Sequence, residues 1–252
     1  MPGVEIHQGA HGFDEAAGNY DRARPDYPER AGGWLAKRLD LRPGRTVLDL
    51  AAGTGKLTQL LVRTGARVIA VEPVAGMRTR LGDALPEVEL YAGTAEAIPL
   101  VSGSVDAVTV AQAFHWFDGD RALAEIHRVT RPGSRLAVVY NRRPLENPLQ
   151  GALEAIVRPH RGDTPAHGSG RWQKAFARTS LWAAVEETEL LHVQHLDREG
   201  VVARIASTSF IAALPDDQRA QLLEQVRALV ANRPEPVELP YVCELFAWER
   251  VP

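Results

Sequence analysis

The chain has 252 residues, of which 45% are hydrophobic and 24% charged, proportions of an ordinary globular protein rather than a disordered or fibrous one. Its formal net charge of −3 gives no general attraction for phosphate, so we expect no nucleic-acid partner. No apolar run approaches the roughly 20 residues of a membrane span, and the N-terminus does not resemble a signal peptide. We therefore expect a cytoplasmic protein without a membrane partner.

The first half of the chain predicts a parallel sheet. A helix is expected over residues 29–39, after a proline-rich segment that disfavours one. Short apolar runs rich in β-branched residues then alternate with helix-like segments, which is the pattern of βαβ units. The expected strands are residues 46–50, 67–72, 88–93, 105–112 and 135–141.

Two crossover helices can be placed between these strands. Leu57, Leu60 and Leu61 recur at helical spacing, and Gly65 follows where a left-handed helix cap is needed. A second helix starts after Asp118 or Asp120 and is stopped by residues 131–133, Arg-Pro-Gly. The segment FHWF, residues 114–117, is thereby expected in a loop at the carboxyl end of a strand.

The second half predicts two more strands and a helical cover. A helix over residues 147–157 leads into a polar linker or flexible loop, residues 161–170. Strand-like residues 185–196 and 238–250 enclose helical patterns at 201–214 and 216–230. We expect an α/β, doubly wound, mostly parallel seven-stranded sheet with helices inserted late. Its parts are a cap segment and helix (1–40), a ligand-binding core (41–145), and a cover with completing strands of the same domain (146–252).

A glycine-rich turn follows the first strand in DLAAGTGKLT, where Gly53 and Gly55 allow a ligand to approach the backbone. The spacing excludes a phosphate-binding P-loop, and Thr58 replaces the third glycine of a dinucleotide site. Glu72, at the end of the second strand, suits the two hydroxyls of a ribose. The turn therefore favours a nucleoside, either in NAD or in S-adenosylmethionine; a solvated helix cap is the alternative for Glu72, and a plain tight turn for the glycines.

Five segments in order resemble the motifs of class I S-adenosylmethionine-dependent methyltransferases, and within them the type 11 group that includes trans-aconitate methyltransferase-like small-molecule enzymes. They are VLDLAAGTGKLT, VIAVEPVAGM, GTAEAIPL, SVDAVTVAQAFHWFD and EIHRVTRPGSRLAVVYN, and they cover residues 46–141. The resemblance implies a Rossmann-like methyltransferase fold and S-adenosyl-L-methionine as the cofactor. The sequence differs from the family at Ala51, which replaces the first glycine, and at Thr94, where an aspartate is common. Each difference is expected to lower the affinity for the cofactor.

The resemblance also implies roles for individual residues. Asp49 would lie near the amino group of the cofactor, Glu72 on its ribose, and Met77 against its adenine. An N-terminal segment would fold over the cofactor. The implied cofactor contacts are Tyr20, Arg24, Asp49, Ala51, Gly53, Gly55, Glu72, Met77, Thr94, Ala95, Glu96 and Gln112. The expected substrate contacts are Tyr27, Phe114, His115, Trp116 and Arg142.

Three roles are open for His115, the one candidate catalytic residue: it can orient a substrate, pack in the core, or act as a general base. Orientation is favoured, because the family has the same histidine with substrates that need no base. Phe114 and Trp116 suit a substrate wall and core packing equally well. For Arg24 the alternative to a cofactor contact is a position in a surface loop. The remaining histidines and the single Cys243 give no pattern of metal ligands, so no metal is expected.

The expected function is transfer of a methyl group to a small organic acceptor, at a carboxylate or hydroxyl oxygen, by in-line displacement. One alternative is an NAD-dependent oxidoreductase, which the glycine pair and Glu72 would also suit, although no hydride-transfer pair is found. The other is a non-catalytic binding module, left open by Ala51 and Thr94.

Overall fold

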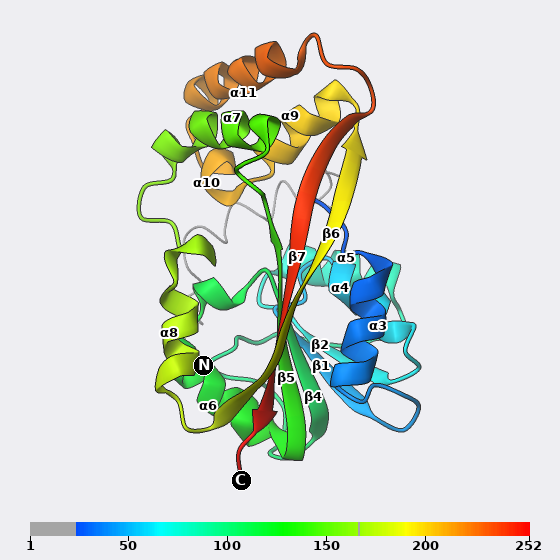
Figure 1. Ribbon diagram of the computed structural model, residues 1–252. Coiled ribbons are helices and arrows are strands. Elements are labelled where there is room, and N and C mark those ends of the chain that lie inside the picture. The colour runs from blue at the N-terminus through cyan, green and yellow to red at the C-terminus, as the bar shows by residue number, and fades with distance from the viewer. Residues whose placement is uncertain (1–23, 166) are drawn as a thin grey trace.

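The computed structural model describes residues 24–165 and 167–252, so that Tyr20 lies outside the described residues. Its seven strands form a single sheet in the order β3-β2-β1-β4-β5-β7-β6 (Figure 1). The strands are β1 (Thr46–Leu50), β2 (Arg67–Val71), β3 (Glu89–Tyr91), β4 (Val105–Ala111), β5 (Thr130–Arg142), β6 (Trp182–Leu196) and β7 (Val237–Arg250).

Helices connect the strands and also gather beyond one edge of the sheet. Short 3-10 turns are η1 (Phe114–Trp116), η2 (Arg158–His160) and η3 (His167–Ser169). The α-helices of the described residues are α3 (Glu29–Arg38), α4 (Lys56–Val62), α5 (Ala75–Ala84), α6 (Gly119–Val129), α7 (Pro148–Val157), α8 (Arg171–Arg178), α9 (Arg198–Ala206), α10 (Ser209–Ala212) and α11 (Asp216–Val230). None of them is long and apolar enough to cross a membrane.

The sheet is doubly wound and mostly parallel, as predicted. β1 pairs in parallel with β2 on one side and β4 on the other, so that Leu48 stands beside both Ile69 and Val108. β7 runs antiparallel to both of its neighbours, β5 and β6. The carboxyl ends of β1, β2, β4 and β5 consequently meet at one edge of the sheet, where ligands of open α/β folds bind.

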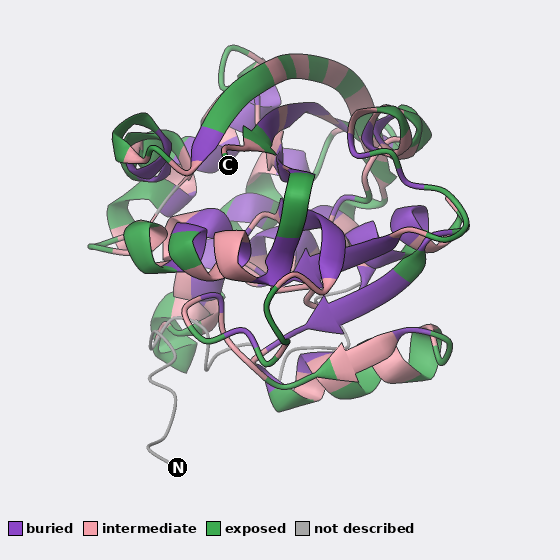
Figure 2. Ribbon diagram, turned by 90° about the horizontal axis from the view of Figure 1, so that it is seen from below, coloured by how far each residue is buried: buried purple, intermediate pink, exposed green. Residues whose placement is uncertain are grey.

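Alternate residues of the central strands face two different layers of helices. Val47 faces α3, α4 and α5, whereas Leu48 faces the opposite layer with α6 and α8. Each helix presents one apolar stripe, as α6 does with Leu123 and Ile126 after its N-cap Asp118. The central strands are buried between these layers, and the outer helix faces are exposed (Figure 2).

A third apolar cluster lies outside the two layers. It joins α7, α9, α10 and α11 to the first part of β7, through residues such as Val226, Leu239 and Tyr241. β6 and β7 are long enough to reach from this helical cover down into the sheet (Figure 1). Since Cys243 and Leu245 of the same strand belong to the sheet core, β7 connects the cover rigidly to the edge where the motifs lie.

The structure corrects the sequence prediction in four places. β5 begins five residues early, at Thr130, because Gly133 with φ +77° forms a bulge rather than a free turn. The helix expected over 201–214 is broken into α9 and α10 at residues 207–208. The helix α8 was not predicted, although Trp172, Ala175 and Phe176 form an apolar stripe. Residues 161–170 are no linker between domains, since His167 packs against Tyr140 of β5.

Substitution of Gly55 tests how much stability the turn after β1 loses when a side chain is placed at a left-handed position. Its φ of +92° is left-handed, and a Cβ there would lie 3.2 Å from Leu81 Cγ. We expect Gly55→Ala to lower the free energy of unfolding by about 2–4 kcal/mol, through strain and overpacking together. Gly103 is the matched control, with φ +63° and no atom within 4 Å of a Cβ; its alanine variant should lose only about 1 kcal/mol. Equal losses in urea denaturation would refute the packing contribution.

Candidate active site

The turn after β1 brings the backbone to the carboxyl edge of the sheet in a left-handed conformation. Ala51, Gly53 and Gly55 have φ values of +56°, +59° and +92°. The backbone N–H of Ala51 donates to the carbonyl of Val71 in β2, which fixes the start of the turn. Ala51 therefore adopts a conformation that favours glycine, at a cost of about 1–2 kcal/mol for its Cβ. The turn exposes backbone where a ligand can approach it.

Glu72 lies beneath this turn and links it to the next helix. Its Oε2 accepts a hydrogen bond of 2.9 Å from the backbone N–H of Gly53, and its Oε1 one of 2.9 Å from that of Val74. Burial raises the pKa of this carboxyl, and the two backbone N–H groups partly oppose that effect. The side chain is 3% exposed, so it is not a solvated helix cap. Two further lone-pair positions of the carboxylate are available to hydroxyl donors.

Met77 and the segment after β3 complete the same side of the site. Met77 is buried at the start of α5, and its Sδ lies 3.9 Å from the position that a Cβ on Gly53 would take. Thr94 forms an isolated bridge with Ala97, and Ala95 is buried against the sheet. Glu96 accepts a 2.9 Å hydrogen bond from the backbone N–H of Asp118, and so joins this segment to the loop that carries FHWF. The site residues predicted from three separate motifs are thus neighbours.

Asp49 is fully buried below the turn. Thr58 and Thr109 donate hydrogen bonds of 2.7 and 2.9 Å to its two carboxylate oxygens. Burial raises the pKa of Asp49 to about 6, because the two hydroxyls only partly compensate for lost water. The side chain holds α4 and β4 to the end of β1. Its predicted contact with a cofactor amino group stays a prediction.

Gln112 directly follows β4 and is also left-handed, with φ +55°. Its Nε2 donates a 3.2 Å hydrogen bond to the carbonyl of Asn141 at the end of β5. Asn141 in turn donates to the carbonyl of Asp26 and accepts a 2.9 Å hydrogen bond from His192 Nε2. Residues with side chains rarely adopt this conformation, and such strain concentrates at functional sites. Gln112 and Ala51 provide two instances, at the ends of adjacent strands.

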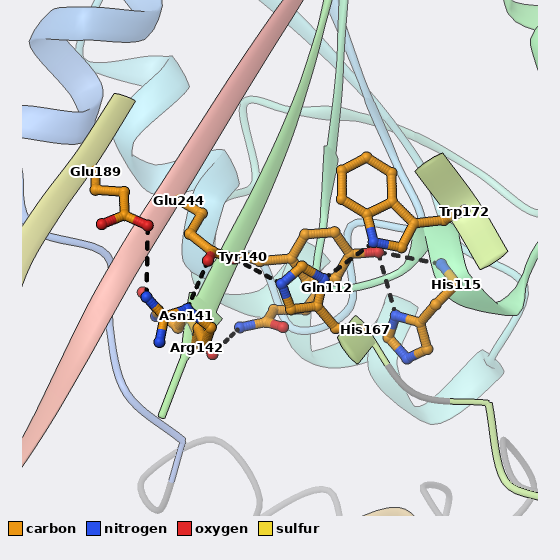
Figure 3. Close-up of polar contacts among 9 residues, drawn as sticks. All are labelled: Gln112, His115, Tyr140, Asn141, Arg142, His167, Trp172, Glu189 and Glu244. Carbon is orange, nitrogen blue, oxygen red and sulfur yellow. Dashed lines mark hydrogen bonds and ion pairs between the residues drawn. The ribbon is translucent and has the colours of Figure 1, made fainter. Parts of the chain in front are cut away.

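His115 follows Gln112 on η1 and is held by the phenol of Tyr140 (Figure 3). The backbone N–H of His115 donates to Tyr140 Oη at 3.1 Å, and His115 Nδ1, at 3.2 Å, is the acceptor within reach of the proton of that hydroxyl. This arrangement leaves Nε2 of His115 as the N–H donor. Burial, with smaller contributions from His167 and Arg24, lowers the pKa of His115 to about 3. The ring is neutral at physiological pH.

Tyr140 is itself fixed by a stacked ring and a chain of hydrogen bonds (Figure 3). His167 stacks on it with ring centroids 3.9 Å apart. Trp172 Nε1 donates to His167 Nδ1 at 3.1 Å, which leaves His167 Nε2 to donate to Glu244 Oε2 at 2.6 Å. Glu244 also accepts a 2.6 Å hydrogen bond from Arg142 Nε. Burial raises the pKa of Tyr140, so its hydroxyl stays protonated and can keep donating to His115.

Two predicted substrate contacts have other roles in the structure. Phe114 is 1% exposed and packs on Phe117, Trp172 and Phe176, which makes it a core residue rather than part of a substrate wall. Arg142 is paired with Glu244 and Glu189, so its charge is already neutralised and not available to an anionic substrate.

The remaining predicted contacts of this group lie closer to the site. Trp116 is half-buried, with its ring 5.1 Å from that of His115. Arg24 Nη2 donates a 2.7 Å hydrogen bond to the carbonyl of Ser207 in the cover, so Arg24 does not lie in a free surface loop. Tyr27 packs against the apolar cluster that includes residues of α3 and α4.

Sequence reasoning missed Tyr140, His167 and Trp172. Tyr140 had a usable signal, as an aromatic at the carboxyl end of a strand in the predicted sheet. His167 had none, because a histidine in a polar, glycine-containing segment is typical of a surface loop. Within residues 24–165 and 167–252, no group of three or more His, Cys, Asp or Glu side chains is placed to hold a metal ion.

Comparisons with known proteins agree with this geometry. A family model described as a methyltransferase domain matches residues 48–138. An uncharacterized methyltransferase of Mycobacterium tuberculosis is 38% identical over 235 residues, which cover 91% of this chain and 92% of the relative. The chain belongs to the S-adenosylmethionine-dependent methyltransferase family. A methyltransferase-like protein of Schizosaccharomyces pombe is 30% identical over 95% of this methyltransferase and 96% of its own length.

Solved structures have the same fold. A protein of Anaeromyxobacter dehalogenans, assigned as a type II methyltransferase, aligns with a TM-score of 0.64 and 25% identity over 89% of this methyltransferase and 97% of that chain. Geranyl diphosphate C-methyltransferase of Streptomyces coelicolor, solved with S-adenosyl-L-homocysteine, has a TM-score of 0.52 and 16% identity over 88% and 78% of the two chains. The prediction of a Rossmann-like methyltransferase fold with S-adenosylmethionine as the cofactor is confirmed. The oxidoreductase and non-catalytic alternatives find no support.

The buried Asp49 predicts an unusual dependence of stability on pH. Its pKa rises from 3.8 to about 6 on folding, so between these values the folded state binds more protons than the unfolded state. Stability is therefore lost as pH rises through that window. We expect Asp49→Asn to be more stable than the wild type by about 1–3 kcal/mol at pH 8, and equal to it near pH 4.

Asp106 is the matched control for Asp49. Although its burial acts to raise the pKa, hydrogen bonds from the Thr46 backbone and Arg131 lower it overall. Asp106→Asn should therefore be less stable than the wild type at pH 8. Urea denaturation at several pH values measures both variants, and an Asp49→Asn variant that is destabilised at pH 8 would contradict the assignment.

Proposed function

We propose that S-adenosylmethionine lies across the carboxyl ends of β1, β2 and β4. Glu72 would accept hydrogen bonds from the two ribose hydroxyls, using the lone pairs that Gly53 and Val74 leave unused. Met77 and Ala95 offer apolar surface for the adenine. The space above Gly53, where even a Cβ would meet only Met77, suits close approach of a cofactor. The further proposed contacts are Arg24, Asp49, Ala51, Gly55, Thr94, Glu96 and Gln112.

The acceptor in this proposal is a small organic molecule methylated at a carboxylate oxygen; a hydroxyl oxygen, the other expected acceptor, would need a base for its proton, which His115 does not supply. The bound cofactor supplies a methyl group on a positively charged sulfur, and the protein has to hold the nucleophile in line behind it, away from water. The observation that carries the proposal is the contact of His115 Nδ1 with Tyr140 Oη, because a hydroxyl that donates to Nδ1 leaves Nε2–H as a donor for a substrate oxygen. Trp116 and Tyr27 are the proposed neighbouring contacts.

His115 acts by orientation in this proposal and not as a base. A group whose conjugate acid has a pKa of about 3 accepts a proton poorly at physiological pH. A carboxylate acceptor is already deprotonated and needs no base, so it suits a neutral donor best. A screen of carboxylic acids, phenols, alcohols and amines with methyl-labelled cofactor tests the proposal. Transfer to amines alone would overturn it.

Glu72 tests the placement of the cofactor. We expect Glu72→Gln to weaken binding of S-adenosylhomocysteine by about 10- to 100-fold, since a carboxylate that accepts from both ribose hydroxyls becomes a neutral amide. Calorimetry measures the affinity. Glu87→Gln is the matched control, because Glu87 is exposed at the end of the connection to β3, and it should bind as the wild type does. An unchanged affinity in Glu72→Gln would place the ribose elsewhere.

Substitution of His115 tests whether its ring acts as a hydrogen-bond donor to the substrate. We expect His115→Asn to keep kcat/KM within about tenfold of the wild type, because its amide can still donate, and His115→Ala to lose about 100-fold. Affinity for S-adenosylhomocysteine should be unchanged in both. The wild-type rate should have no inflection from His115 between pH 5 and 8, since the pKa of this ring is about 3. An inflection near pH 6–7 that disappears in His115→Asn would identify a general base instead.

A further inference from the structure

Arg204 is a buried guanidinium in the helical cover. It lies on α9 and is 8% exposed. Its Nε donates a 3.0 Å hydrogen bond to Tyr241 Oη, and its Cζ lies 6.0 Å from the centroid of the same ring. Across residues 24–165 and 167–252, no carboxylate forms an ion pair with Arg204, and its Nη1 and Nη2 have no hydrogen-bond acceptor and remain accessible to solvent.

The positive charge around Arg204 exceeds the negative charge available to it. Arg143 and Arg161 both pair with Glu154, one on each of its oxygens, so that this single carboxylate is shared by two guanidiniums. Burial, followed by the charge of Arg204, lowers the pKa of Arg143. A buried charge is costly unless it is paired, and an arginine does not escape that cost by losing its proton. An anion bound to Arg204 would offset this positive charge, and the described residues do not supply one.

Contacts place Arg204 on the acceptor side of the site. Tyr241, to which it donates, stacks with His192 at 5.6 Å, and His192 donates to Asn141 beside Gln112. In the other direction, Ser207 Oγ donates to the Arg204 carbonyl. Ser207 lies three residues after Arg204, at the C-terminal end of α9.

The carbonyl of Ser207 accepts the hydrogen bond from Arg24, whose charge acts on His115. The first chain of contacts leads to Asn141 and Gln112 at the ends of β5 and β4, and the second leads to Arg24. Glu72, which follows β2, and Met77, in the first turn of α5, lie on the other side of β1 from these strands.

We propose that Arg204 binds an anionic group of the methyl acceptor, a carboxylate or a phosphate, through its Nη1 and Nη2 donors. The planar fork of an arginine matches either group with two parallel hydrogen bonds. This inference rests on the proposed function for the identity of the ligand, whereas the unpaired charge belongs to the free protein. An acceptor held at one end by Arg204 would present its other end toward His115.

The first test measures anion binding without catalysis. The melting temperature of the full chain is followed as acetate or inorganic phosphate replaces chloride at constant ionic strength. We expect the wild type to rise by about 2–4 °C, and Arg204→Met to be unaffected by either anion. The melting temperature of Arg204→Met in chloride should equal or exceed that of the wild type, because an unpaired buried charge is removed. If Arg204 only stabilised the fold, Arg204→Met would have a lower melting temperature than the wild type in chloride, and that result would contradict the proposal.

Two further variants keep this test decisive. Arg227 is an exposed arginine of the same cover, already paired with Glu199 and Glu224, and Arg227→Met should keep the full anion effect. Arg204→Lys retains the charge but loses the fork, and should show a reduced anion effect with normal folding; it replaces the methionine variant if that one does not fold. An anion effect that is the same in wild type and Arg204→Lys would overturn the proposal.

The second test uses methyl transfer to matched acceptors. Each dicarboxylic acid is compared with its own monoamide, and each carboxylic acid that bears a phosphate group with its hydroxyl analogue, so that both members keep a carboxylate to accept the methyl group. We expect the member with the additional anionic group to have a kcat/KM about 10- to 100-fold higher in the wild type. The ratio should fall to about one in Arg204→Met, mainly through KM. Calorimetry with S-adenosylhomocysteine should give the same affinity in both proteins; a loss there would assign Arg204 to the cofactor carboxylate and overturn the proposal.

The two proposals fail in different ways. Absence of methyl transfer to every acceptor, with anion protection that is lost in Arg204→Met, would refute the proposed function and leave the anion site standing. Transfer to neutral acceptors without any anion effect would refute the anion site alone.

Discussion

The site depends on a chain that leaves β1 and β4 in a left-handed conformation. Gly53 and Gly55 adopt it without steric cost, whereas Ala51 and Gln112 carry side chains and adopt it under strain. The strain is tolerated because each residue is held from a neighbouring strand, Ala51 by the carbonyl of Val71 and Gln112 by that of Val139. The consequence is a sheet edge at which backbone, rather than side chains, faces a ligand. The proposed cofactor contacts Gly53, Glu72 and Gln112 follow the strands that end at that edge.

Buried polar groups then determine which chemistry this edge can support. Asp49 and Glu72 are carboxylates kept under the turn by hydroxyl and backbone donors, and burial raises the pKa of each. Tyr140 and His115 are neutral for the same reason, because burial disfavours the charged form of both rings. The edge therefore combines fixed hydrogen-bond donors with little mobile charge. Such a site positions a nucleophile well and removes protons poorly, in agreement with a reaction whose main demand is alignment.

Much of this arrangement could be predicted from the sequence, because it depends on local patterns. β-branched runs located the central strands, Gly65 and Asp118 marked helix ends, and five motifs in order indicated the family and its cofactor. The predictions failed where distant segments decide the outcome. Phe114 could not be distinguished from a substrate contact until Trp172 and Phe176, more than fifty positions away, were seen to enclose it. His167 and Arg204 carry no motif, and their significance comes only from what tertiary packing places beside them.

The long strand β7 explains how the cover can take part in the chemistry of the sheet. Its first residues, including Tyr241, belong to the apolar cluster of α7, α9 and α11, while Cys243 and Leu245 belong to the sheet core. A continuous strand is stiff over this length, so Tyr241 and the Arg204 that donates to it are held at a fixed position relative to Asn141 and Gln112. Different covers on a common sheet could thereby select different acceptors without altering the cofactor turn. In this chain the cover contributes Arg204, the residue that we propose binds the anionic group of the acceptor.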